Sequence, residues 1–192
     1  MIYLALNIER AMQINEFHWE REVIIKAHCQ DKRSAAELIA CETSERTDLA
    51  ANTILEHLLS REALGTTGFG GGFALPHALV PKLRSPAKLL ITLRQSIEFG
   101  APDDEPVDII LALLWPTERQ DGFLPALARY CRLFRAERIL SGLRSASSKT
   151  EAMMVLHSFS DSDVLASSDW TALHERPNGG TRSRDSQSVN SF

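Results

Sequence analysis

The sequence has few cysteines, and none of them lie close together. Cys29, Cys41 and Cys131 are the three thiols of the chain, and no C-x-x-C pair occurs. A disulfide-stabilised small domain and a zinc ribbon both need several closely spaced cysteines. The sequence therefore predicts neither, and the three thiols are typical of a reduced, intracellular protein.

The chain also lacks an excess of positive charge. Its 21 lysines and arginines are outnumbered by 25 aspartates and glutamates, which gives a net charge of -4. This balance supplies no broad attraction for nucleic-acid phosphates or for an anionic membrane surface, and it leaves room only for a local basic patch. We therefore expect no nucleic-acid partner.

No stretch of the sequence has the pattern of a membrane helix. The longest uncharged run, Ala63–Pro81, contains five glycines and two prolines, whereas a lipid-exposed span needs an unbroken apolar helix. Met1–Met12 has no basic leader and no small-residue cleavage site. These features predict a cytoplasmic protein without a membrane span.

Apolar residues are abundant enough for one packed domain. The chain has 192 residues, of which 44% are hydrophobic and 24% charged, and this composition is typical of a globular domain with extra segments. We place the domain at residues 14–157, after an N-terminal extension at 1–13. Residues 158–192 hold nine serines and few large apolar side chains, so they are predicted to form a mobile polar tail.

Hydrophobic periodicity predicts helices that flank one sheet, which is an α/β or α+β sandwich. A short strand is expected over Glu22–Cys29, and buried central strands are expected over Lys88–Arg94 and Val107–Trp115. Residues that favour helix starts stand at Ser34, Asp48 and Ser148. Thr66–Pro81 is expected to contain a loop, a short strand and a second loop.

A further helix is expected from Asp121 onward. Its apolar face is predicted to comprise Leu124, Leu127, Ala128, Cys131 and Phe134. Arg129, Arg132 and Arg135 are expected on its solvent face.

The glycine-rich stretch before His77 is the region where chemistry is expected. A dinucleotide-binding G-x-G-x-x-G pattern starting at Gly68 would need a glycine where Phe73 stands, and no Gly-Lys-Ser/Thr follows. Five glycines are more typical of a tight turn. His77 follows Pro76, and an imidazole with an ordinary pKa of about 6.5 is largely neutral and nucleophilic near pH 7, so it is able to attack phosphorus.

A partly buried histidine at a strand end is the plainer interpretation of His77. The other five histidines show no metal-ligand spacing. We therefore predict no metal and no cofactor.

Two segments resemble a known family. Arg61–His77, REALGTTGFGGGFALPH, resembles the phosphorylation-site motif of the type 2 EIIA domains of the bacterial phosphotransferase system, the fructose/mannitol and nitrogen-regulatory class. Ile97–Pro116, IEFGAPDDEPVDIILALLWP, is similar to the family's second signature. Val80–Leu83 looks closer to the nitrogen-regulatory branch. The resemblance implies the mannitol-specific EIIA-like fold, with a single mixed β-sheet flanked by helices.

The same resemblance assigns roles to individual residues. It implies that His77 accepts a phosphoryl group from the phosphohistidine of HPr or of its nitrogen-branch relative, and that Arg61 is the active-site arginine. A guanidinium offsets charge on phosphoryl oxygens and donates paired hydrogen bonds to them, although a surface salt bridge is the plainer role for an arginine. Further donor candidates are Thr66, Thr67 and the backbone N–H groups near Gly72 and Phe73.

Three positions depart from the family pattern. Gly71 stands where the family usually has asparagine, and Ala78 where it commonly has glycine. Phe123 aligns with the second active-site histidine. A phenyl ring donates no hydrogen bond to a phosphoryl oxygen, so any stabilisation from that histidine is absent here.

The sequence thus predicts a nitrogen-regulatory EIIA phosphocarrier whose phosphorylation state changes its binding to other proteins. Phe123 and Gly71 motivate an alternative, an EIIA fold that binds partners without being phosphorylated. A weaker alternative is a sugar-specific EIIA subunit that serves a separate EIIB.

Overall fold

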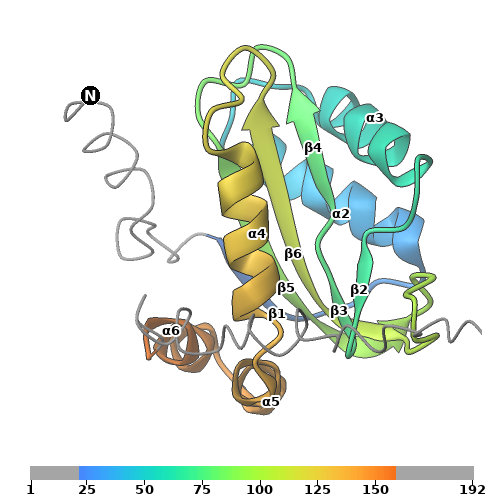
Figure 1. Ribbon diagram of the computed structural model, residues 1–192, viewed down its shortest axis with the longest axis vertical. Helices are drawn as coiled ribbons and strands as arrows, with labels where there is room; N and C mark the ends of the chain where they lie inside the picture. Colours follow the sequence, from blue (N-terminus) through green and yellow to red (C-terminus); the bar gives the residue numbers. More distant parts are fainter. Residues whose placement is uncertain (1–21, 159–192) are drawn as a thin grey trace, which may run out of the picture.

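The computed structural model describes residues 22–158. The predicted N-terminal extension at 1–13 and the predicted tail beyond Ser158 lie outside the described residues. Within the described part, six strands form one sheet and five helices pack around it (Figure 1).

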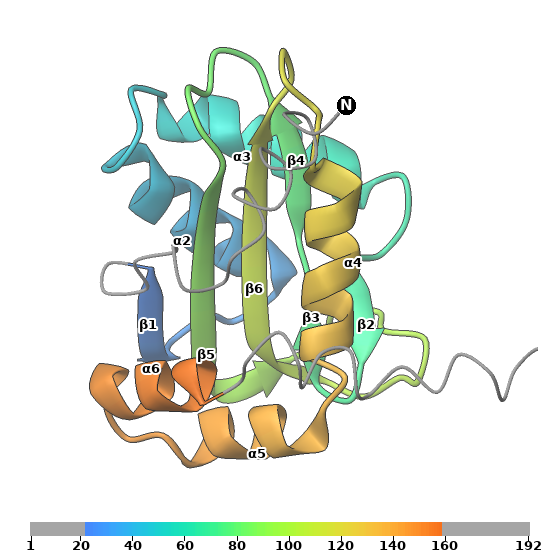
Figure 2. The same cartoon turned by 60° about the vertical axis from the view of Figure 1, so that its left-hand side comes forward.

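The sheet is mixed, as the family resemblance implied. Its main path runs β1 (Val23–Ala27), β5 (Ala87–Ile97), β6 (Val107–Pro116), β3 (Phe73–Ala74) and β2 (Gly68–Gly70), and β4 (His77–Val80) also pairs with β6. The β5–β6 and β2–β3 pairs are antiparallel, whereas β1–β5, β3–β6 and β4–β6 are parallel. Figure 2 shows β5 and β6 at the centre.

Helices cover both faces of this sheet. α2 (Lys32–Ser44) and α3 (Ala51–Glu62) lie on one face, and α4 (Phe123–Leu133) lies on the other (Figures 1 and 2). α5 (Glu137–Ser145) and α6 (Lys149–His157) pack at the end of the sheet below α4. None of these helices is long and apolar enough to cross a membrane.

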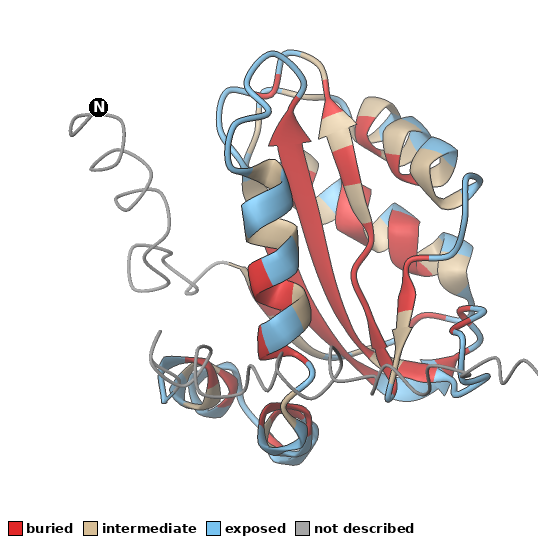
Figure 3. Cartoon of the chain, viewed as in Figure 1, coloured by how far each residue is buried: buried red, intermediate tan, exposed pale blue. Residues whose placement is uncertain are grey.

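Helices cover both faces of β6, and this coverage explains why its sequence is mostly apolar. Ile109, Ile110, Leu111 and Leu114 are fully buried, as the red strand in Figure 3 shows, and this burial pattern is typical of a central strand between two helical layers. The strands predicted over Lys88–Arg94 and Val107–Trp115 are therefore confirmed.

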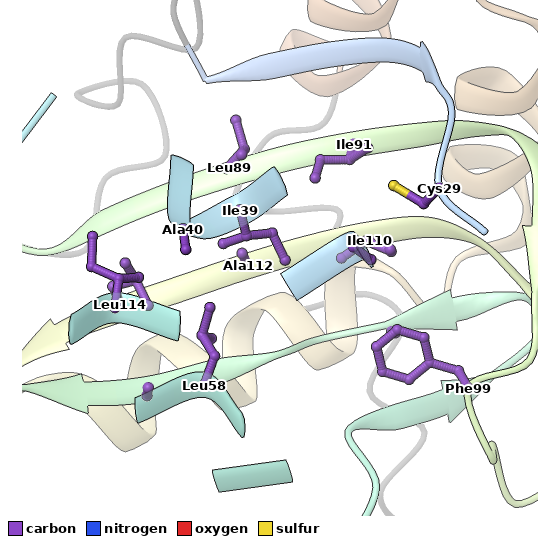
Figure 4. Packing of buried hydrophobic residues seen from close by; sticks show 14 of the residues in the cluster. Cys29, Ile39, Ala40, Leu58, Leu89, Ile91, Phe99, Ile110, Ala112 and Leu114 are labelled. Carbon is purple, nitrogen blue, oxygen red and sulfur yellow. The ribbon is translucent and has the colours of Figure 1, made fainter. Parts of the chain in front are cut away.

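Two apolar cores follow from this layering. One lies between the sheet and α2 and α3 and includes Ile39, Leu58 and Ile110 (Figure 4). The other lies between the sheet and α4, α5 and α6, where the rings of Phe73 and Phe134 stack with centroids 4.6 Å apart. Arg61 of α3, His77 of β4 and Phe123 of α4 lie where these three elements meet.

Three of the four expected helix starts were wrong. α2 begins earlier, because Asp31 is its N-cap and exchanges hydrogen bonds with Ser34 in a capping box. α3 begins after Ala50, and the carboxylate of Asp48 instead pairs with Arg84 at 2.9 Å. α4 begins after Gly122 rather than at Asp121.

The fourth expected start is confirmed. Ser148 is the N-cap of α6, and its hydroxyl accepts the backbone N–H of Glu151 at 3.2 Å.

The predicted buried face of α4 was also wrong in part. Leu124 is 72% exposed, whereas Arg129 is buried beside Tyr130. The side chains of this segment that pack on the second core are Phe123, Ala126, Leu127, Tyr130, Cys131, Leu133 and Phe134, so the predicted positions of Leu127, Cys131 and Phe134 are confirmed. These positions repeat every three or four residues from the true helix start, and that spacing defines the packed stripe.

Candidate functional site

His77 is the first residue of β4, between the two helical layers. Its backbone pairs with Leu113 of β6, and its side chain is half-buried. Figure 1 shows β4 with α3 on one side and α4 on the other. Residues from both helices therefore reach the imidazole.

The imidazole of His77 is held at both of its nitrogens. Nε–H of Arg61, in the last turn of α3, donates to Nε2 at 3.0 Å. Nδ1 lies 2.8 Å from the carbonyl oxygen of Leu75, which only accepts hydrogen bonds. The proton therefore sits on Nδ1, and Nε2 carries the lone pair of a neutral ring.

Burial is the main reason why the pKa of His77 lies below its ordinary value of 6.5. The positive charge of Arg61 lowers it further, whereas the Leu75 carbonyl and the negative charge of Glu62 act in the opposite direction. The net lowering favours the neutral imidazole near pH 7, which is the nucleophilic form.

The guanidinium of Arg61 has a second contact. One of its terminal nitrogens, Nη1, donates to the carbonyl oxygen of Gly65 at 3.0 Å. This carbonyl lies in the loop that directly follows α3. Arg61 is thus held between the loop and His77, and it faces the nitrogen that bears the lone pair.

Phe123, the first residue of α4, packs against the imidazole of His77. The ring centroids of His77 and Phe123 are 5.9 Å apart, and the rings are tilted by 60°. Trp115 packs against Phe123 at 5.8 Å. Phe123, which the sequence resemblance matches with a second active-site histidine, therefore lies beside His77, where its apolar ring donates no hydrogen bond.

The two threonine candidates have hydroxyls that are engaged elsewhere. The hydroxyl of Thr66 donates to the carbonyl oxygen of Phe99 at 2.9 Å. The hydroxyl of Thr67 donates to the Glu62 carboxylate at 2.6 Å. Neither hydroxyl proton is directed at His77.

Glu62 is a residue that sequence reasoning missed. Its carboxylate binds the hydroxyl and the backbone N–H of Thr67, and it pairs with Lys32 at 2.8 Å. The only signal in the sequence is its position directly after Arg61. That position alone does not distinguish it from an exposed helix-end glutamate.

Gly72 and Phe73 lie away from His77. Phe73 pairs with Ile109 of β6, whereas His77 pairs with Leu113, a separation of about 13 Å along a strand that rises about 3.3 Å per residue. The structure therefore does not bring these backbone groups to the imidazole.

The glycines between β2 and β3 form a tight turn. Gly70, Gly71 and Gly72 all have positive φ angles, of 98°, 63° and 77°. The Asp103 carboxylate accepts the N–H of Gly71 at 2.7 Å, and Arg144 donates to the carbonyl oxygen of Gly71 at 2.7 Å. Positive φ at Gly71 also makes the exchange with asparagine conservative, because asparagine is among the residues that adopt this conformation.

Ala78, the remaining departure from the family pattern, is buried in β4. It pairs with Leu114 of β6 and packs in the core below α3. Its methyl group fits without displacing His77 from the strand.

Comparison with known proteins decides the family. Residues 16–158 match the family described as "Phosphoenolpyruvate-dependent sugar phosphotransferase system, EIIA 2". The chain belongs to the type 2 EIIA family. The resemblance of its two motifs is confirmed, and His77, Arg61 and Phe123 all lie within the matched residues.

The type 2 EIIA relatives include proteins named "Nitrogen regulatory protein". The one from Klebsiella oxytoca is 29% identical over 153 residues, which cover 79% of this chain and 94% of the relative. The one from Escherichia coli is 32% identical over 133 residues, covering 68% and 81%. These similarities place the chain among the nitrogen regulatory proteins of the family.

Solved structures agree with this assignment. The nitrogen regulatory protein IIA-Ntr from Neisseria meningitidis superimposes with a TM-score of 0.68 at 27% identity, covering 71% of this chain and 93% of that one. IIA mannitol from Escherichia coli gives a TM-score of 0.62 at 13% identity, covering 71% and 96%. The latter similarity shows the shared fold alone.

Proposed function

We propose that this protein is a cytoplasmic phosphocarrier of nitrogen-regulatory type, which accepts a phosphoryl group on Nε2 of His77 from the phosphohistidine of an HPr-like protein. The observation that carries the proposal is the pair of hydrogen bonds on the imidazole. Leu75 fixes the proton on Nδ1, and Arg61 lies on the lone pair of Nε2. A nucleophile and a cation that complements phosphoryl charge are therefore adjacent.

The transfer step forms one bond and breaks one bond. The Nε2 lone pair attacks phosphorus, and the P–N bond of the donor phosphohistidine breaks, so its electron pair returns to the donor imidazole. The Nδ1 proton of His77 stays in place, where the Leu75 carbonyl stabilises the positive charge that develops on the ring. The step moves the phosphoryl group from one imidazole to the other and needs no further reactant.

Arg61 has to move from the nitrogen to the phosphoryl oxygens as phosphorus approaches. Its terminal nitrogens and Nε provide a fork of donors that matches these oxygens. Phosphoryl transfer depends mainly on positioning and on compensation of charge, so one well-placed arginine supports it when the second histidine is absent.

The phosphorylation state would then change which proteins the chain binds. The added phosphoryl group places negative charge between α3 and α4, on a surface that otherwise presents an aromatic ring and a guanidinium. The sugar-specific EIIA alternative has less support, because the relatives described above are named as nitrogen regulatory proteins.

One observation favours the alternative of a regulator that is never phosphorylated. Phe123 packs against the imidazole and donates no hydrogen bond. In that case His77 and Arg61 would form a fixed binding surface instead of a reactive pair.

Incubation with a phosphorylated HPr-type donor separates the two functions. We expect intact mass spectrometry to show the gain of one phosphoryl group that is labile to acid and stable to base. His77→Ala is expected to abolish the gain, whereas the control His157→Ala, at an exposed position of α6, leaves it unchanged. An unphosphorylated wild-type protein would favour the phosphate-independent regulator.

A further inference from the structure

Glu62 forms a compact set of hydrogen bonds beside the site. Its Oε2 atom accepts from the hydroxyl of Thr67 at 2.6 Å and from the backbone N–H of Thr67 at 3.0 Å. Its Oε1 atom accepts from Lys32 of α2 at 2.8 Å. The carboxylate therefore joins the end of α3 to the start of α2 and to the loop before β2.

These contacts close the loop that holds Arg61. Glu62 and Thr67 are the two ends of a short segment that contains Gly65, whose carbonyl accepts from Arg61 at 3.0 Å. Gly65 itself has a φ of 148° and no heavy atom within 4 Å of a Cβ built on it. The N–H of Gly65 donates to the backbone carbonyl of Glu62 at 3.1 Å, and the side-chain hydrogen bond between Glu62 and Thr67 ties the two ends of the segment together.

Burial strengthens the hydrogen bonds of Glu62 with Thr67 and Lys32, which together we call the Glu62 clasp. The side chain of Glu62 is 15% exposed, and Thr67 is 7% exposed. Charge-assisted hydrogen bonds in such a setting are stronger than those between neutral groups and are little screened by solvent. An ordinary helix-end glutamate in water would not constrain the loop in this way.

We propose that Glu62 is a positioning residue for the phosphoryl transfer proposed above: its clasp on Thr67 and Lys32 fixes the Gly65 carbonyl, and that carbonyl holds the Arg61 guanidinium against Nε2 of His77. The inference rests on the proposed function for its effect on rate. The placement of Arg61 is measurable without any phosphate.

The sign of a pKa change distinguishes positioning from simple charge. Arg61 lowers the pKa of His77, and the negative charge of Glu62 raises it, with Arg61 the larger influence of the two. If Glu62 acts only through its charge, Glu62→Ala lowers the pKa of His77. If it positions Arg61, the same substitution releases the guanidinium, and the pKa rises.

NMR titration of the full chain with ¹⁵N-labelled histidine measures this pKa in four proteins. These are the wild type, Glu62→Ala, Arg61→Ala and the double variant. We expect Glu62→Ala to raise the pKa of His77 in the wild-type background and to lower it in the Arg61→Ala background, where only the charge effect is left. A lowering in both backgrounds, or no change in either, would overturn the proposal.

Two further variants distinguish the effect of the hydrogen bonds of Glu62 from the effect of a carboxylate charge. Thr67→Val removes the hydroxyl donor and keeps the carboxylate, and we expect it also to raise the pKa of His77. Glu56→Ala removes an exposed carboxylate from the same helix and is expected to leave the imidazole titration unchanged. Thermal unfolding of each variant verifies that it is folded under the titration conditions.

The phosphotransfer assay supplies the second readout. A misplaced catalytic group costs on the order of 100-fold in rate, so we expect Glu62→Ala to slow phosphoryl acceptance by about 100-fold while Glu56→Ala keeps the wild-type rate. Wild-type speed in a folded Glu62→Ala protein would overturn the proposal. If the wild type accepts no phosphate, the proposed function fails, and the NMR titration still decides whether Glu62 positions Arg61.

Discussion

Nε–H of Arg61 donates to Nε2 of His77 at 3.0 Å, so the guanidinium rests on the same nitrogen that we propose as the nucleophile. The contact has two effects. It helps to keep the imidazole neutral, since the positive charge of Arg61 lowers the pKa of His77. It also holds the guanidinium next to the position that the phosphoryl oxygens would occupy.

The first prediction concerns pH. Burial and Arg61 lower the pKa of His77 from 6.5, so the neutral, nucleophilic form should persist below that value and be lost only as pH falls through the lowered pKa. NMR titration of the free protein is expected to give a midpoint for His77 below 6.5. A midpoint at or above 6.5 would contradict a net lowering of this pKa by burial and Arg61.

The second prediction concerns Phe123. Its ring lies 5.9 Å from the imidazole of His77, and loss of one well-placed donor costs on the order of 100-fold in rate. Phe123→His is therefore expected to accelerate phosphoryl acceptance or to slow hydrolysis of the phosphohistidine.

Leu124→His is the matched control for that experiment. It places a histidine one residue away, at a side chain that is 72% exposed, so we expect neither rate to change. An identical response of the two variants would argue against a specific role for position 123.

The third prediction concerns stability of the glycine turn. Gly72 has a φ of 77°, and a Cβ there would clash with a terminal guanidinium nitrogen of Arg144 and lie 2.9 Å from the Asp108 carboxylate. Arg144 and Asp108 form a bidentate ion pair. Gly72→Ala combines backbone strain of about 1 to 2 kcal/mol with displacement of this pair.

Gly71→Ala is the control at the neighbouring position. Gly71 also has a positive φ, but a Cβ there meets only Leu140 at 3.8 Å, so it should cost the backbone strain alone. Urea denaturation is expected to show a clearly larger loss of unfolding free energy for Gly72→Ala. Equal losses would mean that Arg144 and Asp108 accommodate the methyl group.

The fourth prediction concerns Lys88, which is 3% exposed in β5. Burial lowers its pKa to about 7, although the Glu22 carboxylate at 3.3 Å acts in the opposite direction. The unfolded chain then binds more protons than the folded one at this side chain between about pH 7 and its ordinary pKa near 10.4. Stability from this residue should therefore rise as pH rises from 7.

Lys88→Met removes that titration. We expect the free energy of unfolding of the variant, measured relative to the wild type, to fall as pH is raised from 7 to 9. Parallel stability curves over that range would show that Lys88 has an ordinary pKa in the folded protein.

The central strands and the proximity of Arg61 and Phe123 to His77 are the parts that could be predicted from the sequence. The runs that became β5 and β6 are mostly apolar because both of their faces are covered, and this pattern is local. The proximity of Arg61 to His77 was predicted in another way, from the resemblance of the segment Arg61–His77 to a family motif and not from hydrophobic periodicity.

The parts that could not be predicted depend on contacts distant in sequence. The buried face of α4 is set by packing on the sheet and not by the mean hydropathy of its residues, so Leu124 is exposed and Arg129 buried. The role that we propose for Glu62 involves its contact with Lys32, which is 30 residues earlier in the chain. A glycine-rich run likewise does not reveal that its turn is held by Asp103 and Arg144.

The most direct test of the account is to find which nitrogen receives the phosphoryl group. Protein labelled with ¹⁵N at histidine, phosphorylated by an HPr-type donor and examined by long-range ¹H–¹⁵N correlation, reports both nitrogens of each imidazole. We expect phosphate on Nε2 of His77 with Nδ1 still protonated toward the Leu75 carbonyl. Phosphate on Nδ1, on another histidine, or on none would contradict the account.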